Sequence, residues 1–168
     1  REEHEGVTIW YYPLTLEIAS NGISLSAMRH YRKLAASADI LHYHYPWPSG
    51  DLLHQLAPKH IPALVTYHSD IVRQKLLKIA YWPLMVRFLR QMRAIVATSP
   101  NYIATSKVLQ RYLSKTTAVP LGVDEGLYPE PSARDMTHWR SVCGEGFFLF
   151  VGALRYYKGL PTLIEAAR

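Results

Sequence analysis

The chain has 168 residues, of which 49% are hydrophobic and 19% are charged, and this balance excludes a disordered protein. Its formal net charge of +6 makes anionic partners plausible, including phosphate groups, nucleic acid and an acidic membrane surface. The single cysteine, Cys143, cannot form an internal disulfide and fits a reducing compartment. We therefore expect a globular, cytoplasmic protein, with a peripheral position on the inner face of the cell membrane as an alternative.

Short runs rich in β-branched or aromatic residues predict strands along the chain. They cover residues 7–12, 39–45, 62–67, 94–98, 117–120 and 147–151. Most are separated by apolar residues at helical spacing, which indicates an alternation of strands and helices. Such alternation predicts an α/β fold with a Rossmann-like parallel sheet and helices on both of its faces.

Capping residues and apolar periodicity place the helices. The predicted helices are residues 25–35 capped by Ser24 or Ser26, residues 51–57 after a loop at 46–50, residues 71–93 interrupted at Pro83, one beginning at Ser99–Pro100, and one capped by Ser106. Residues 126–146 are rich in Pro, Gly, Ser and charge, so we expect an interdomain connection containing a short helix. The expected division is a first domain over 1–125, this connection, and a second domain starting at 147–168.

Polar side chains follow several of the predicted strands. His44, His68 with Asp70, and Ser99 all fall at strand ends. Ligands of open α/β sheets bind outside the carboxyl ends of the strands, so we interpret these four residues as candidates for a binding cleft. His42 and His44 share one strand face, and with His68 and Asp70 they have the residue types of a metal site, but no second short-spaced ligand pair supports it.

The stretch 147–168 reads as a buried strand, a loop and a helix. Gly152 ends the strand and lets the backbone approach a ligand, and the cations Arg155 and Lys158 stand in the loop before the helix. Cations beside a helix N-terminus can form a phosphate site. The alternative is that both are ordinary solvated side chains.

Several motifs together resemble glycosyltransferases of family 4, which have the GT-B fold. They are DILHYHYPWP, VTYHSD, ATSPNYIATSKVL, VPLGVD and FVGALRYYKGLPTLIEA, in the order of the family and across most of the chain. The variants of these motifs are similar to enzymes that build bacterial surface polysaccharides. One departure is Ala153, which stands where the family usually has an Arg; here Arg155 follows two residues later.

The resemblance implies a retaining, metal-independent transfer of a sugar from a nucleotide-sugar donor to a glycan or lipid-linked acceptor, with no cofactor. It implies that His68 is the catalytic-centre residue that hydrogen-bonds the donor sugar, and that Arg155, Lys158 and Gly152 bind the donor phosphates. His44, Asp70 and Ser99 would line the acceptor and donor cleft. The family's Gly-rich loop and its Glu-x7-Glu segment are not in the printed sequence, so we expect an internal fragment that is inactive alone.

Other classes fit the sequence less well. No Asp-x-Asp, G-x-G-x-x-G or Walker-type loop occurs, and no nucleic-acid recognition motif is found. Residues 71–123 contain no acidic side chain, and an apolar stripe within residues 82–93 lies among cations. This pattern is typical either of a helix on an anionic membrane surface, predicted over 71–93, or of a core helix with a solvated outer face. A non-catalytic module that binds anions or a membrane is the remaining alternative.

Overall fold

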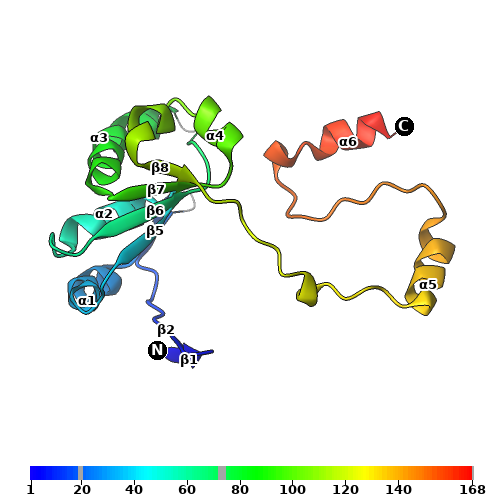
Figure 1. Cartoon of the computed structure of the whole chain (residues 1–168), viewed down its shortest axis with the longest axis horizontal. Coiled ribbons are helices and arrows are strands. Elements are labelled where there is room, and N and C mark those ends of the chain that lie inside the picture. Colours follow the sequence, from blue (N-terminus) through cyan, green and yellow to red (C-terminus); the bar gives the residue numbers. More distant parts are fainter. Residues whose placement is uncertain (19–20, 72–74, 168) are drawn as a thin grey trace. The chain divides into compact units, whose positions relative to one another are not determined.

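A computed structural model describes residues 1–18, 21–71 and 75–167. The chain divides into two compact units, Arg1–Gly122 and Val123–Arg168, and each is described by itself (Figure 1). The first unit contains a four-stranded sheet flanked by helices. No helix among the described residues is both long and apolar enough to span a bilayer.

The sheet of the first unit is parallel throughout. Its strands are β5 (Leu41–Tyr45), β6 (Ala63–Tyr67), β7 (Ala94–Ala97) and β8 (Thr116–Ala118), in the order β5-β6-β7-β8. Tyr45 lies opposite Tyr67, and Tyr67 lies opposite Ala97, so the carboxyl ends of β5, β6 and β7 are level. The predicted α/β class with a Rossmann-like parallel sheet is confirmed.

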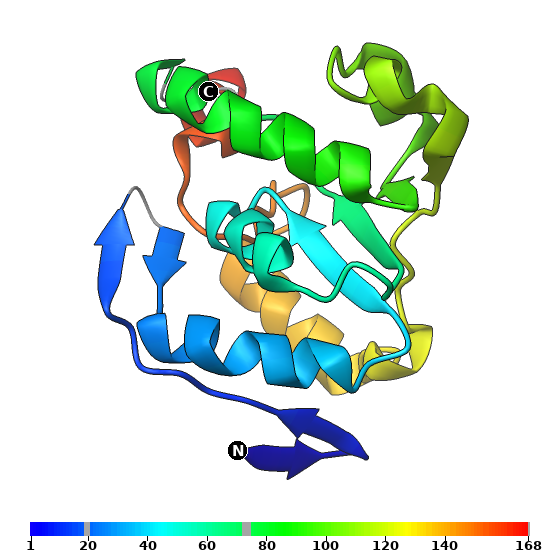
Figure 2. The ribbon, with the colours of Figure 1, turned by 90° about the vertical axis from the view of Figure 1, so that its left-hand side faces the viewer.

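Three helices cover one face of this sheet. They are α1 (Leu25–Ala36), α2 (Pro48–Leu56) and α3 (Lys75–Gln91), which lie side by side in Figure 2. Ser24 begins α1, because its hydroxyl accepts a hydrogen bond from the Ala27 N–H at 3.3 Å. The helix α2 begins three residues earlier than predicted, because Pro48 needs no hydrogen-bond partner in the first turn.

The helix α3 runs through Pro83 without interruption, so the predicted break there is wrong. Proline in a helix interior costs about 3 kcal/mol, but burial of a large apolar face exceeds that cost. The face consists of Met85, Phe88 and Leu89, and Met92 continues it directly after the helix; each of the four is 0–2% exposed. The apolar stripe of this helix is therefore core, and these four side chains are not available to a membrane.

A lysine from a later segment closes α3. The ammonium of Lys115 donates hydrogen bonds to the carbonyl oxygens of Leu89, Arg90 and Met92 at 2.7, 2.9 and 2.8 Å. The carbonyls of Leu89 and Arg90 are among those that a helix C-terminus leaves without internal partners, and Met92 lies directly after the helix. Lys115 ends the 3-10 helix η1 (Leu109–Lys115), which follows the short helix α4 (Pro100–Thr105). The predicted helix after Ser106 thus takes the tighter 3-10 form.

The first predicted strand does not join the parallel sheet. It is the short strand β2 (Val7–Ile9), which pairs antiparallel with β1 (Glu2–His4) across a turn at Glu5 and Gly6. Both turn residues have positive φ, 49° and 80°. A second local hairpin, β3 (Leu16–Ile18) with β4 (Asn21–Ile23), was not predicted. Local pairing satisfies the backbone of these segments, which explains the difference.

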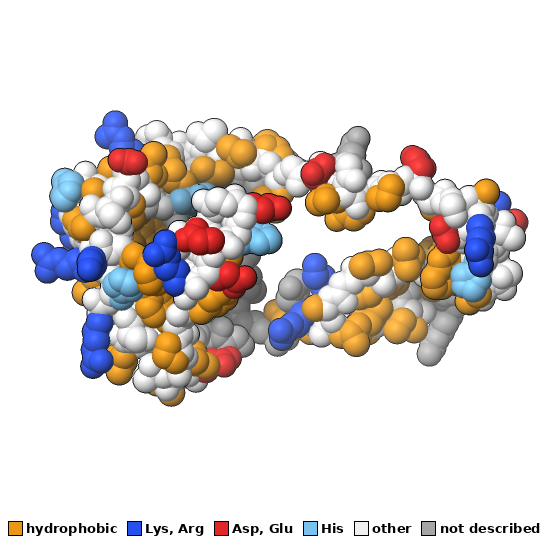
Figure 3. All heavy atoms as spheres, turned by 90° about the horizontal axis from the view of Figure 1, so that it is seen from below, with side chains coloured by type: hydrophobic (Ala, Val, Ile, Leu, Met, Phe, Trp, Pro, Cys, Tyr) orange, Lys and Arg blue, Asp and Glu red, His pale blue; other side chains and the backbone are white. Residues whose placement is uncertain are grey.

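The second unit contains helices but no strand within its described residues. Its elements are η2 (Glu125–Leu127), α5 (Ala133–Cys143), η3 (Tyr156–Lys158) and α6 (Leu160–Ala166). The strand predicted over residues 147–151 is wrong: Phe148, Leu149 and Val151 are 73%, 74% and 84% exposed. A parallel strand needs a hydrogen-bonded neighbour, and the described part of this unit offers none. Figure 3 shows the hydrophobic side chains at the surface of this unit.

Candidate functional site

Two histidines meet at the carboxyl ends of adjacent strands. His44 belongs to β5 and His68 directly follows β6, and Nδ1 of His44 lies 2.8 Å from Nε2 of His68. The backbone N–H of His68 donates a hydrogen bond to the Tyr45 carbonyl at 2.9 Å, which continues the pairing of β5 and β6 beyond the end of β6. Both side chains are exposed. The structure thus brings two of the predicted cleft residues, His44 and His68, together at the carboxyl end of the sheet.

Asp70 lies just beyond His68 but contacts other groups. Its Oδ1 accepts hydrogen bonds from the Tyr67 hydroxyl at 2.6 Å and from the Ser106 hydroxyl at 2.9 Å, and its N–H donates to the Tyr102 hydroxyl. These contacts join β6 to α4 and to the start of η1. Asp70 therefore anchors the loop that carries His68.

Ser99 caps a helix at the end of the next strand. Its hydroxyl accepts the N–H of Tyr102 at 3.1 Å and begins α4, as the Ser-Pro pattern predicts. Through Tyr102, which touches Asp70, Ser99 supports the same loop. Within the part of the chain that the structure describes, no three His, Cys, Asp or Glu side chains are grouped to hold a metal ion.

The predicted phosphate-binding residues belong to the second unit. Arg155 and Lys158 are exposed and flank one 3-10 turn, in which the Lys158 N–H donates to the Arg155 carbonyl at 2.9 Å. Gly159 follows with φ 68°, a left-handed conformation that favours glycine, and begins α6. Gly152 is exposed before this turn. The turn places both cations on one short segment, three residues apart.

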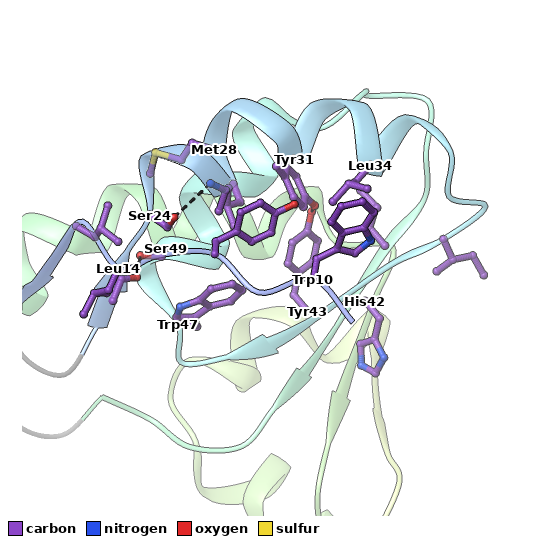
Figure 4. A pocket seen from close by; sticks show the side chains of 17 residues that line it. Trp10, Leu14, Ser24, Met28, Tyr31, Leu34, His42, Tyr43, Trp47 and Ser49 are labelled. Atoms are coloured by element: carbon purple, nitrogen blue, oxygen red, sulfur yellow. Dashed lines mark hydrogen bonds between the residues drawn. The ribbon is translucent and has the colours of Figure 1, made fainter. Parts of the chain in front are cut away.

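A cavity of about 620 Å³ lies beside β5 in the first unit. Aromatic side chains from separate segments line much of it: Trp10, Tyr12, Tyr31, Tyr43 and Trp47. In Figure 4, Tyr31 of α1 and Tyr43 of β5 point toward one another, and their hydroxyls are hydrogen-bonded. The Tyr12 hydroxyl is likewise paired with His30 at 2.6 Å. These three tyrosine hydroxyls are thus hydrogen-bonded within the protein, and the lining that remains is mostly apolar, with Ser24, His42 and Ser49 among its polar residues.

Sequence reasoning missed a pair of buried titratable groups in α2. Asp51 is 1% exposed and accepts a hydrogen bond from the Tyr81 hydroxyl, while His54 is 5% exposed and lies 3.0 Å from the Tyr43 hydroxyl. Burial raises the pKa of Asp51 to about 7, although the Tyr81 hydrogen bond opposes the shift. Burial, aided by the charge of Lys59, lowers the pKa of His54 to about 4. Polar residues on a predicted helix gave no sign of this burial.

These two groups should make folding stability depend on pH in opposite directions. The raised pKa of Asp51 gives stability that is complete below its ordinary value of 3.8 and is lost as pH rises toward 7. The lowered pKa of His54 gives stability that is complete above its ordinary value of 6.5 and is lost as pH falls toward 4. Between about pH 4 and 7 the two contributions oppose each other.

We therefore expect single substitutions to expose each contribution. In Asp51→Asn, unfolding midpoints in urea should fall on acidification more steeply than in the unsubstituted chain, because the opposing contribution of Asp51 is gone and that of His54 remains. In His54→Gln, the midpoints should instead fall as pH rises through this interval. Midpoint curves parallel to that of the unsubstituted chain in both variants would contradict the assignment.

The parallel sheet defines a Rossmann-like α/β protein, and the contact between His44 and His68 is its candidate site, at the carboxyl ends of the strands, where ligands of such sheets bind. The sequence profile described as Glycosyltransferase Family 4 matches residues 1–127. The chain belongs to this glycosyltransferase family.

Two curated proteins are similar to the chain over most of its length. D-rhamnosyltransferase WbpZ of Pseudomonas aeruginosa is 51% identical over 153 residues, which are 91% of this chain and 40% of the relative. O-antigen chain mannosyltransferase C of Escherichia coli is 44% identical over 164 residues, which are 98% of this chain and 44% of the relative. The chain thus spans less than half the length of these two relatives.

Proposed function

We propose that the full-length protein transfers a sugar from a nucleotide-sugar donor to a hydroxyl of a glycan or lipid-linked acceptor during surface-polysaccharide synthesis. The observation that carries this proposal is the family match over residues 1–127, together with two relatives whose names both describe sugar transfer. We further propose the GT-B fold, retention of the anomeric configuration and no requirement for a metal.

The names of the relatives also suggest the donor sugar. D-rhamnose is D-mannose without its exocyclic hydroxyl, so the two relatives transfer sugars whose ring hydroxyls share one configuration. We therefore propose a donor with the D-mannose configuration. In this proposal His68 hydrogen-bonds a sugar hydroxyl, and Arg155 and Lys158 neutralise the charge that develops on the departing diphosphate.

Contact with an anionic membrane is a separate part of the proposal. The apolar stripe of α3 is buried, so such a contact would use the exposed cations Arg87, Arg90 and Arg93 near its end. A peripheral contact of this kind would suit an acceptor that is carried on a lipid. The non-catalytic alternative is less favoured, because both similar proteins are named as transferases.

A donor comparison tests the main proposal. The full-length protein should transfer D-mannose or D-rhamnose from a nucleotide at least about tenfold faster than glucose, because a hydroxyl of the wrong configuration leaves polar groups of the site unpaired. A chelator should leave the rate unchanged, and NMR of the product should show the donor's anomeric configuration. Transfer of glucose but of neither manno-configured sugar would overturn the donor assignment, and absence of transfer from every donor would favour the non-catalytic alternative.

A further inference from the structure

The contact between His44 and His68 restricts what His68 can do. The two ring nitrogens lie 2.8 Å apart, and the rings are nearly parallel, with an interplanar angle of 13° and centroids 5.1 Å apart. Each nitrogen of a neutral imidazole is either an N–H donor or a bare acceptor. A contact this short requires one donor and one acceptor, so the proton on one ring determines the proton on the other.

The sheet holds this contact in place. His42, two residues before His44 on the same strand face, stacks on it with ring centroids 4.8 Å apart. His42 is itself fixed by Thr66 of β6, whose hydroxyl lies 2.8 Å from its Nε2. His68 is held by its backbone, because its backbone N–H donates a hydrogen bond to the Tyr45 carbonyl. His44 therefore lies between two imidazoles whose positions are set by paired strands.

We infer that His44 is a positioning residue for His68, and this inference rests on the proposed transferase function. Because His44 occupies Nε2 of His68, only Nδ1 of His68 remains to hydrogen-bond a donor-sugar hydroxyl. The same contact couples the tautomer of His68 to that of His44, so the character of Nδ1 of His68, donor or acceptor, is tied to the proton on His44 before the sugar arrives. Pre-organisation of this kind lowers the cost of ordering the site.

The choice of substitution can separate positioning from simple packing. In asparagine the amide atoms are attached to Cγ, as Nδ1 is in histidine, so His44→Asn keeps a hydrogen-bonding atom at the position that touches His68. His44→Gln moves that group one bond further out, and His44→Leu removes it. His60→Asn is a matched control, because His60 is an exposed histidine in a turn before β6. Unfolding curves establish that each variant is folded.

Nitrogen NMR of the imidazole rings reads the tautomer directly, without any activity assay. In the full-length protein with labelled histidine, His68 should show one protonated and one bare ring nitrogen, assigned by their loss in His68→Asn. His44→Leu and His44→Gln should shift both signals, because Nε2 of His68 loses its partner, whereas His44→Asn should keep Nε2 hydrogen-bonded and His60→Asn should leave both signals unchanged. His68 signals unchanged in all four variants would overturn the inference.

Kinetics then test whether the tautomer matters for transfer. We expect His44→Leu to lower kcat about 10- to 100-fold, the range for removing a partner that orients a metal-binding histidine, with KM for the donor changed less. His44→Asn should restore most of the rate. A full rate in His44→Leu with an altered tautomer would overturn the positioning role while leaving the proposed function intact. Absence of transfer in the unsubstituted protein would count against the proposed function, while the NMR result would still decide the tautomer.

Discussion

Replacing Phe88 with alanine should destabilise the first unit by about 3–5 kcal/mol, the range for truncating a buried aromatic side chain. Phe88 is 0% exposed and joins α3 to both the sheet and α2. Its ring meets the ring of Tyr43 edge-on at 5.3 Å and that of His54 at 5.5 Å. Alanine would leave a cavity between these rings and remove two favourable aromatic contacts. Chemical unfolding followed by tyrosine fluorescence or circular dichroism measures the change.

The same helix provides a control for this experiment. Ile79 of α3 is 71% exposed, so Ile79→Ala should change the free energy of unfolding by no more than about 0.5 kcal/mol. The comparison separates burial from helix propensity, because both substitutions place alanine in one helix. Similar unfolding midpoints for the two variants would show that α3 does not pack as described. It would also reopen the alternative that its apolar stripe faces a membrane.

Replacing Lys158 with alanine in the full-length protein should lower kcat/KM for sugar transfer about 10²- to 10³-fold, equivalent to about 3–4 kcal/mol of transition-state stabilisation. Under the proposed function, negative charge builds on the departing diphosphate in the transition state. A positioned ammonium therefore stabilises the transition state more than it stabilises the ground state. Arg155 flanks the same 3-10 turn and should act on the same charge. Lys158→Arg should recover part of the rate, because it keeps the charge but changes its geometry.

A lysine in the other unit serves as the matched control. Lys33 lies exposed in the last turn of α1, so Lys33→Ala removes one positive charge at a residue that is not assigned to the phosphate site. Its kcat/KM should stay within about twofold of the unsubstituted protein, in line with the small effects of most surface substitutions. If Lys158→Ala also turned over at the full rate, the phosphate-binding assignment would be refuted. An equal loss in both variants would instead indicate a general effect of net charge.

The sequence by itself determined the features that depend on neighbouring residues. Strand composition placed β5, β6 and β7 within a few residues of their observed bounds, and the Ser-Pro pair at Ser99 marked the start of α4. The motifs also indicated the family, which the profile match over residues 1–127 confirms. Side-chain shape, helix capping and apolar period act over one or two turns, so a contiguous stretch contains most of what they need.

The tertiary structure alone decided which distant residues meet. Nothing in the separate motifs around His44 and His68 indicates a 2.8 Å contact, because it depends on β5 lying next to β6. Burial of Asp51 depends likewise on Tyr81 of α3, thirty residues further along the chain. The run at residues 147–151 has the composition of a strand but stays exposed, because a strand exists only with a partner to accept its hydrogen bonds. Local sequence preference indicates which helix or strand a segment can form. Contacts between segments far apart in the chain determine whether that element forms and which residues it packs against.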